Sequence, residues 1–149
     1  MFKSFAMAFA VLLSGSLMLS ISLHAMEIEK FDKMAIPDKG DYIALLLGGA
    51  QKFLMDEGKH DLLAKVNRLF TEVHEGDQMS IGMIEFEENL DRARLLDAER
   101  YAKDHNTPRL EVEHAMLLTL KRNGIVLPKT FMTVGNKFKP KHPAREEKK

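Results

Sequence analysis

The chain of 149 residues contains neither cysteine nor tryptophan. Without cysteine there is no disulfide, no thiol nucleophile and no thiolate ligand for zinc. The N-glycosylation pattern Asn-X-Ser/Thr is absent, and so is the Gly-X-Ser-X-Gly turn of many serine hydrolases. The Gly-rich loop that binds phosphates does not occur either, because the Gly48-Gly49 pair lies inside a helical pattern. No sequence motif therefore predicts a cofactor, and we expect the protein to have none.

The first 25 residues have the layout of a secretory signal peptide. Lys3 supplies one positive charge, residues 4–23 carry none, and charged residues follow directly after Ala25. A small residue such as Ala25 is a suitable last residue of a signal, and we predict cleavage after it. Because Leu23 is bulkier than the residue usually found at its position, cleavage after Ser22 is the alternative.

The uncharged run also permits a second interpretation, an N-terminal anchor that is never cleaved. The run has 20 residues, and a helix that spans a bilayer needs about that many. Gly15 and four serines interrupt it, which favours the cleaved signal over the anchor. Both interpretations export the rest of the chain. The expected location is therefore secreted or periplasmic, with anchoring by the N-terminal segment as the alternative.

Charge is distributed unevenly along the chain, although Lys+Arg and Asp+Glu are equal at 22 each. Residues 129–149 hold seven Lys or Arg against two Asp or Glu, so the body before them is acidic. We divide the exported part into a helical domain with a C-terminal arm, 26–138, and a disordered basic tail, 139–149. The simplest interpretation of the tail is a solvated terminus, and otherwise it contacts the protein's own body or an anionic envelope surface. Export argues against nucleic acid as a partner.

Apolar residues recur at helical spacing and predict four main helices. The first is expected over 42–57, capped by Asp41, with Pro37 separating it from a short lead-in. Gly48 and Gly49 interrupt this helix. We expect these two glycines to allow another helix to approach closely, because no side chain stands between the backbones.

The second and third helices have clear ends. The second is expected to begin after Asp61 and to end at Gly76. The short connection after Gly58 predicts that it forms an antiparallel hairpin with the first helix. The third helix, 81–103, is the longest, and Ser80 is its predicted N-cap.

The fourth helix is expected to begin at Pro108 after a Thr107 cap and to be closed by Gly124. Its second half is apolar on nearly all sides, which predicts the central buried helix. An extended segment, 125–128, follows, and the arm to residue 138 is expected to lie across the helices. The predicted fold is all-α, a compact bundle of about four helices with an extended C-terminal arm.

The candidate metal ligands are Glu111 and His114. They stand three residues apart, which is the spacing that supplies two ligands to dimetal helical bundles. Such a site needs a second pair of this kind and two further carboxylates. The chain offers no second pair on one helical face, and a histidine at the edge of the core is the simpler interpretation of His114.

The amphipathic helices and the lack of a convergent polar site favour a non-enzymatic exported protein, with an interaction or structural role in the cell envelope. Its partner would be an unidentified protein or envelope component. Membrane contact is expected only through the N-terminal segment or the basic tail. The alternative hypothesis is a metal-binding or metal-dependent helical protein that uses Glu111 and His114.

Overall fold

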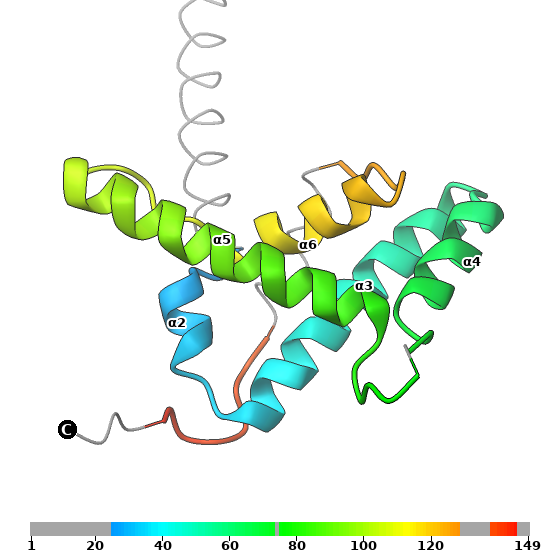
Figure 1. The fold of residues 1–149 in the computed structure, drawn as a ribbon, viewed down its shortest axis with the longest axis horizontal. Helices are drawn as coiled ribbons and strands as arrows, with labels where there is room; N and C mark the ends of the chain where they lie inside the picture. The colour runs from blue at the N-terminus through cyan, green and yellow to red at the C-terminus, as the bar shows by residue number, and fades with distance from the viewer. Residues whose placement is uncertain (1–24, 74, 129–137, 146–149) are drawn as a thin grey trace, which may run out of the picture.

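The structure, a computed structural model, describes residues 25–73, 75–128 and 138–145 (Figure 1). These residues form five helices and no strand, which confirms the predicted all-α class. The helices are α2 (Ile28–Asp32), α3 (Ile36–Asp56), α4 (His60–Leu69), α5 (Ile81–Lys103) and α6 (Val112–Arg122). None of them combines the length and the apolar character that crossing a bilayer requires. The predicted signal segment, except for Ala25, and most of the predicted arm lie outside the described residues.

Helix α3 begins at Ile36, six residues before the predicted start, and Pro37 lies in its first turn. The predicted Asp41 cap is therefore wrong, since Asp41 lies inside the helix and the N-cap is Ala35. Proline is tolerated in the first turn because the backbone N–H groups there have no partner within the helix.

Helices α3 and α4 form the predicted hairpin (Figure 1). Gly58 turns the chain with a φ of +68°, and the side-chain amide of Gln51 donates to Asn67 Oδ1 at 2.7 Å across the pair. The prediction was wrong about both ends of α4. Asp61 lies in the first turn, and the helix ends at Leu69, well before Gly76.

The loop after α4 explains its early end. An isolated antiparallel bridge joins Val73 to Ser80, and the N–H of Ile81 donates to the carbonyl of Glu72 at 2.8 Å. These contacts hold the backbone of the loop outside the helical path. Gly76 lies in this loop with a φ of +88°, which favours glycine.

The close approach that was predicted at Gly48 occurs at another glycine. A Cβ added at Gly48 would meet nothing within 4 Å, so the prediction for this residue is wrong. A Cβ added at Gly82 would lie 2.9 Å from the carbonyl oxygen of Leu69 and from two ring carbons of Phe70. Glycine at the start of α5 therefore lets that helix contact the end of α4.

Helix α5 has the predicted bounds, and its N-cap is confirmed. The Ser80 hydroxyl accepts from the N–H of Met83 at 3.2 Å, which satisfies one of the unpaired donors of the first turn. Further along, the buried Asn89 donates to Thr119 Oγ1 of α6 at 2.9 Å. This bond ties the two helices together inside the core.

Helix α6 buries Val112, Ala115, Met116 and Leu120 in the core, but it begins at Val112 and not at the predicted Pro108. The residues before it are held in extended pairing with the chain that leads into α2. The N–H of Ile28 donates to the carbonyl of Leu110 at 3.2 Å, and the N–H of Val112 donates to the carbonyl of Met26 at 2.9 Å. Backbone groups used in this pairing are not available for a helical turn.

The core combines apolar side chains from all five described helices with four residues outside them, Met26, Met34, Ile125 and Leu127. Its fully buried members are Tyr42, Leu46, Ala50, Leu54, Val66, Phe86, Leu90, Val112, Met116, Leu120 and Ile125. Residues 125–128 lie outside the helices, and Gly124 closes α6 with a φ of +78°.

The C-terminal segment, 138–145, lies against α3 and α2. The ring of Phe138 packs on Tyr42 with its centroid 5.1 Å away, and the N–H groups of Lys141 and His142 both donate to the Asp38 carboxylate at 3.0 Å. The sequence predicts disorder from residue 139 onward. The structure describes 139–145 in contact with the body, and residues 146–149 lie outside the described part.

Candidate functional site

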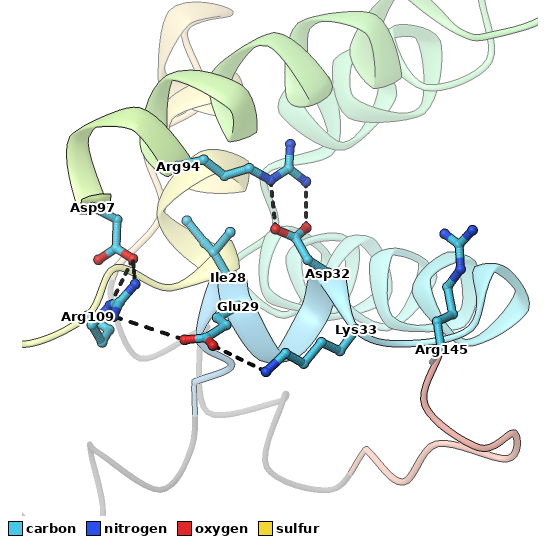
Figure 2. A pocket seen from close by; sticks show the side chains of 8 residues that line it. All are labelled: Ile28, Glu29, Asp32, Lys33, Arg94, Asp97, Arg109 and Arg145. Atoms are coloured by element: carbon cyan, nitrogen blue, oxygen red, sulfur yellow. Dashed lines mark hydrogen bonds and ion pairs between the residues drawn. The ribbon is translucent and has the colours of Figure 1, made fainter. Parts of the chain in front are cut away.

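An open groove of about 650 Å³ lies between α2, the second half of α5, the segment before α6 and the C-terminal segment (Figure 2). Charged side chains dominate its lining. The lining residues are Ile28, Glu29, Asp32, Lys33, Arg94, Asp97, Arg109 and Arg145. The four cationic side chains come from four separate parts of the chain, so the tertiary fold creates the groove.

Arg94 connects α5 to α2 across the groove. Its Nε and Nη2 atoms donate to the two oxygens of Asp32 at 2.8 and 2.6 Å, in the two-pronged geometry that suits a guanidinium and a carboxylate (Figure 2). Arg94 also pairs with Asp91 one turn earlier on its own helix. The hydrogen bond to Asp32 is the largest of the causes that raise the pKa of Arg94, and its positive charge is therefore permanent.

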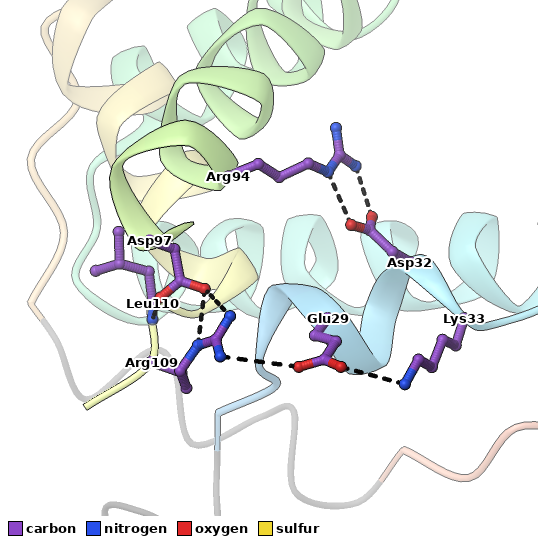
Figure 3. A network of polar contacts seen from close by, with 7 residues as sticks. All are labelled: Glu29, Asp32, Lys33, Arg94, Asp97, Arg109 and Leu110. Atoms are coloured by element: carbon purple, nitrogen blue, oxygen red, sulfur yellow. Dashed lines mark hydrogen bonds and ion pairs between the residues drawn. The ribbon is translucent and has the colours of Figure 1, made fainter. Parts of the chain in front are cut away.

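Arg109 and Asp97 form a second pair, which fixes the segment before α6 (Figure 3). Nε and Nη2 of Arg109 donate to one oxygen of Asp97 at 3.0 and 2.8 Å, and the N–H of Leu110 donates to the other at 2.8 Å. Burial tends to raise the pKa of Asp97, but these hydrogen bonds and the nearby positive charges outweigh it and lower the pKa. The guanidinium also lies 4.2 Å from the centre of the Tyr101 ring, a favourable cation–π arrangement.

The remaining charges of the groove are held more loosely. Lys33 pairs with Glu29 at 3.2 Å, and both side chains are 55 % exposed. Exposed pairs one helical turn apart contribute only about 0.3–0.5 kcal/mol, so Lys33 can change partner at little cost. Arg145 is placed by its backbone, whose N–H donates to the carbonyl of Lys33 at 2.7 Å. Its guanidinium makes no ion pair with any residue that the structure describes.

This arrangement is suited to holding an anion. Four cations face three carboxylates, and the positive charge of Arg145 is the one left unmatched in the described lining. The lining contains no serine, threonine, tyrosine or histidine that could act as a nucleophile or a general base. The groove can therefore bind and orient a charged group.

Neither of the predicted metal ligands is among the residues that line this groove. Glu111 is the N-cap of α6 with an extended backbone, so the two residues do not share a full helical turn. Burial is the largest cause of the raised pKa of Glu111, followed by the negative charge of Glu27. His114 is exposed and not at the edge of the core. Among the described residues, no group of three or more His, Cys, Asp or Glu could hold a metal ion. Metal binding by Glu111 and His114 stays a prediction from their spacing.

Sequence reasoning missed the buried carboxylate of Glu113, which lies between the two residues it singled out. Glu113 is 0 % exposed, and burial raises its pKa to about 7, although hydrogen bonds from its own N–H and from that of Met26 act in the opposite direction. The helical spacing of the sequence does indicate that Glu113 is buried. Glu113 precedes Met116 by three residues and Leu120 by seven, which places it on the apolar stripe of α6.

The fold and the groove define a small all-α protein with an ion-paired, solvent-open groove. Searches against protein-family models, curated proteins and solved structures found no match.

Proposed function

We propose that the protein is an exported, non-enzymatic binding protein whose groove receives an acidic group of a protein partner. The observation that carries this proposal is the convergence of Lys33, Arg94, Arg109 and Arg145 on one open groove. Guanidinium groups bind carboxylates through paired hydrogen bonds, and three of the four cations are arginines.

The ion pairs that the four cations of the groove already make indicate where the acidic group would bind. Arg94 and Arg109 are held by Asp32 and Asp97 through hydrogen bonds of 2.6–3.0 Å, so they form fixed walls. Arg145 has no ion pair among the described residues, and Lys33 has only an exposed one. A carboxylate that enters between Lys33 and Arg145 gains two cations without breaking either of the stronger pairs.

Two further features support a binding role over catalysis. The lowered pKa of Asp97 keeps this carboxylate ionised at neutral pH, so it cannot serve as an acid. Arginine remains protonated at any physiological pH and cannot serve as a base. Export itself is supported by the signal layout of the first 25 residues and agrees with the lack of any nucleic-acid motif.

The test is a titration of the isotope-labelled protein with a blocked tetraglutamate peptide, followed by amide chemical shifts. We expect saturable shifts in 28–33 and near Arg145. Replacement of Arg145 by glutamine should weaken binding about two- to fivefold, which is the range for one exposed charge contact. The control is Arg122→Gln, which removes an exposed cation in the last turn of α6, outside the groove lining.

Two results contradict the proposal. One is a peptide titration without saturable shifts in the groove, and the other is an equal loss of affinity in both variants. A second measurement is purification from the envelope fraction after mild extraction. A monomer that carries no partner under those conditions counts against an interaction role.

A further inference from the structure

Glu113 differs from the other buried carboxylates of the described residues because its hydrogen-bond partners among those residues are a backbone N–H and a tyrosine hydroxyl. Asp38 contacts the ring nitrogen of His142, and Asp97 contacts Arg109. The oxygens of Glu113 instead lie 3.4 and 3.2 Å from the backbone nitrogen of Met26. The hydroxyl of Tyr42 donates to one of the same oxygens.

Met26 is held in this position from several sides. Its carbonyl accepts from the N–H of Val112, the N–H of Ile28 pairs with Leu110, and its side chain is buried in the core at 7 % exposure. The nitrogen of Met26 is therefore fixed opposite a carboxylate that is fully removed from water. Met26 is also the residue that follows Ala25, the predicted last residue of the signal peptide.

We propose that export processing cuts the bond between Ala25 and Met26, and that the new α-ammonium group of Met26 forms a buried ion pair with Glu113. In this step water adds across the peptide bond under the action of a signal peptidase. Ala25 leaves with a carboxylate, and the nitrogen of Met26 gains two hydrogens to become an ammonium group. The cut precedes final folding, because Met26 is buried once the domain has formed.

The ion pair resolves an electrostatic problem of the uncut chain. A buried carboxylate without a positive partner is costly, and this is why burial raises the pKa of Glu113. An amide nitrogen supplies one donor and no charge, whereas an ammonium nitrogen at the same place supplies three donors and a full positive charge. Charge-assisted hydrogen bonds of this kind are about twice as strong as neutral ones.

The position of Glu113 also distinguishes between the two predicted cleavage sites. A cut after Ser22 would leave three residues before Met26, and the nitrogen that faces Glu113 would remain an amide. A cut after Ala25 places the ammonium group at the carboxylate. The proposal thus gives processing a structural role, since removal of the signal completes the core of the mature protein. It rests on the export proposed above and is independent of binding in the groove.

The first test uses the full chain, expressed with its own signal and purified from the exported fraction. The N-terminal peptide measured by mass spectrometry is expected to begin at Met26. Limited acetylation of the folded protein should then modify the α-amine on the order of tenfold more slowly than exposed lysines, and denaturant should abolish the difference. A mature chain that begins at any other residue overturns the proposal, and so does an α-amine that reacts as fast as the lysines.

Two matched variants test the partner of the ammonium group. Glu113→Gln removes the facing carboxylate, and we expect the melting temperature of the processed protein to fall on the order of 10 °C and its α-amine to react faster. Glu111→Gln makes the same chemical change two residues earlier, at a half-buried carboxylate whose charge is disfavoured by burial and by Glu27, so it should not lower the melting temperature and should leave the α-amine protected. Equal effects of the two variants refute the ion pair. If E113Q does not fold, the N-terminal mass and the acetylation of the wild-type protein still decide.

Discussion

Alanine substitutions at Gly48 and Gly82 are expected to change stability in opposite directions. Gly48 lies inside α3, where an added Cβ meets no atom within 4 Å. Alanine in a helix interior is favoured over glycine by about 1 kcal/mol, because glycine loses more backbone freedom on folding. For a domain of this size, Gly48→Ala should raise the melting temperature by about 3–4 °C.

Gly82 provides the matched case in which the same methyl group has no room. Its added Cβ would lie 2.9 Å from the carbonyl oxygen of Leu69, a backbone atom that cannot rotate aside, and from the ring of Phe70. Overpacking of this kind costs about 1–3 kcal/mol. The higher helix propensity of alanine over glycine offsets less than about 1 kcal/mol of this cost at the second residue of α5. Gly82→Ala should therefore lower the melting temperature by about 3–7 °C.

Thermal unfolding followed by circular dichroism at a helix wavelength measures both changes, and urea denaturation supplies the free energies. The slopes of the urea transitions should match the wild type, because neither substitution alters the surface exposed on unfolding. If both variants shift the melting temperature in the same direction, the start of α5 does not pack on the end of α4 as described. A destabilising Gly48→Ala would show that another element covers that face of α3.

Asp97→Asn should lower the free energy of unfolding, measured by urea denaturation, by about 2 kcal/mol, because the buried carboxylate accepts from a guanidinium and a backbone N–H. The control is Asp91→Asn at an exposed carboxylate, which should change the free energy of unfolding by less than about 1 kcal/mol. Because the folded pKa of Asp97 lies below 3.8, the stabilisation that its carboxylate provides is present above pH 3.8 and is lost as the pH falls through the folded pKa. A free energy of unfolding that increases as the pH is lowered through this range would contradict the pairing. Thr119→Val should cost about 1–2 kcal/mol by calorimetry, since Asn89 loses a buried acceptor, and T119S should restore most of it. Asp38→Asn should speed hydrogen exchange of the two amides that bond to its carboxylate, and unchanged exchange would argue against that contact.

The predicted helices that agree with the structure are those with short-range signals. Ser80 and Met83 are three residues apart, and their hydrogen bond marks the start of α5 as predicted. Gly58 and Gly124 adopt positive φ values after α3 and α6, where the sequence places the ends of these helices. In each case the residue and the group it satisfies lie within one helical turn, so a local pattern contains the needed information.

The errors occur where a distant segment competes for the same backbone. The local sequence Thr107-Pro108 is typical of a helix N-terminus. Helix α6 nevertheless begins later, because the backbone of Leu110 pairs with Ile28 and with the carboxylate of Asp97. The charged groove could not be predicted for the same reason. Arg94 and Asp32 are 62 residues apart, and no local pattern links them.

The sequence by itself determined the all-α class, the bounds of α5, the hairpin of α3 and α4, and the buried stripe of α6, because helical periodicity and capping act over a few residues. The tertiary structure alone decided which charges meet in the groove and which carboxylate is enclosed in the core. Glu113 and Met26 are 87 residues apart, and neither has a special role until folding brings them together. Burial then turns an ordinary glutamate into a group that requires a positive partner, because a charge removed from water must be compensated within the protein.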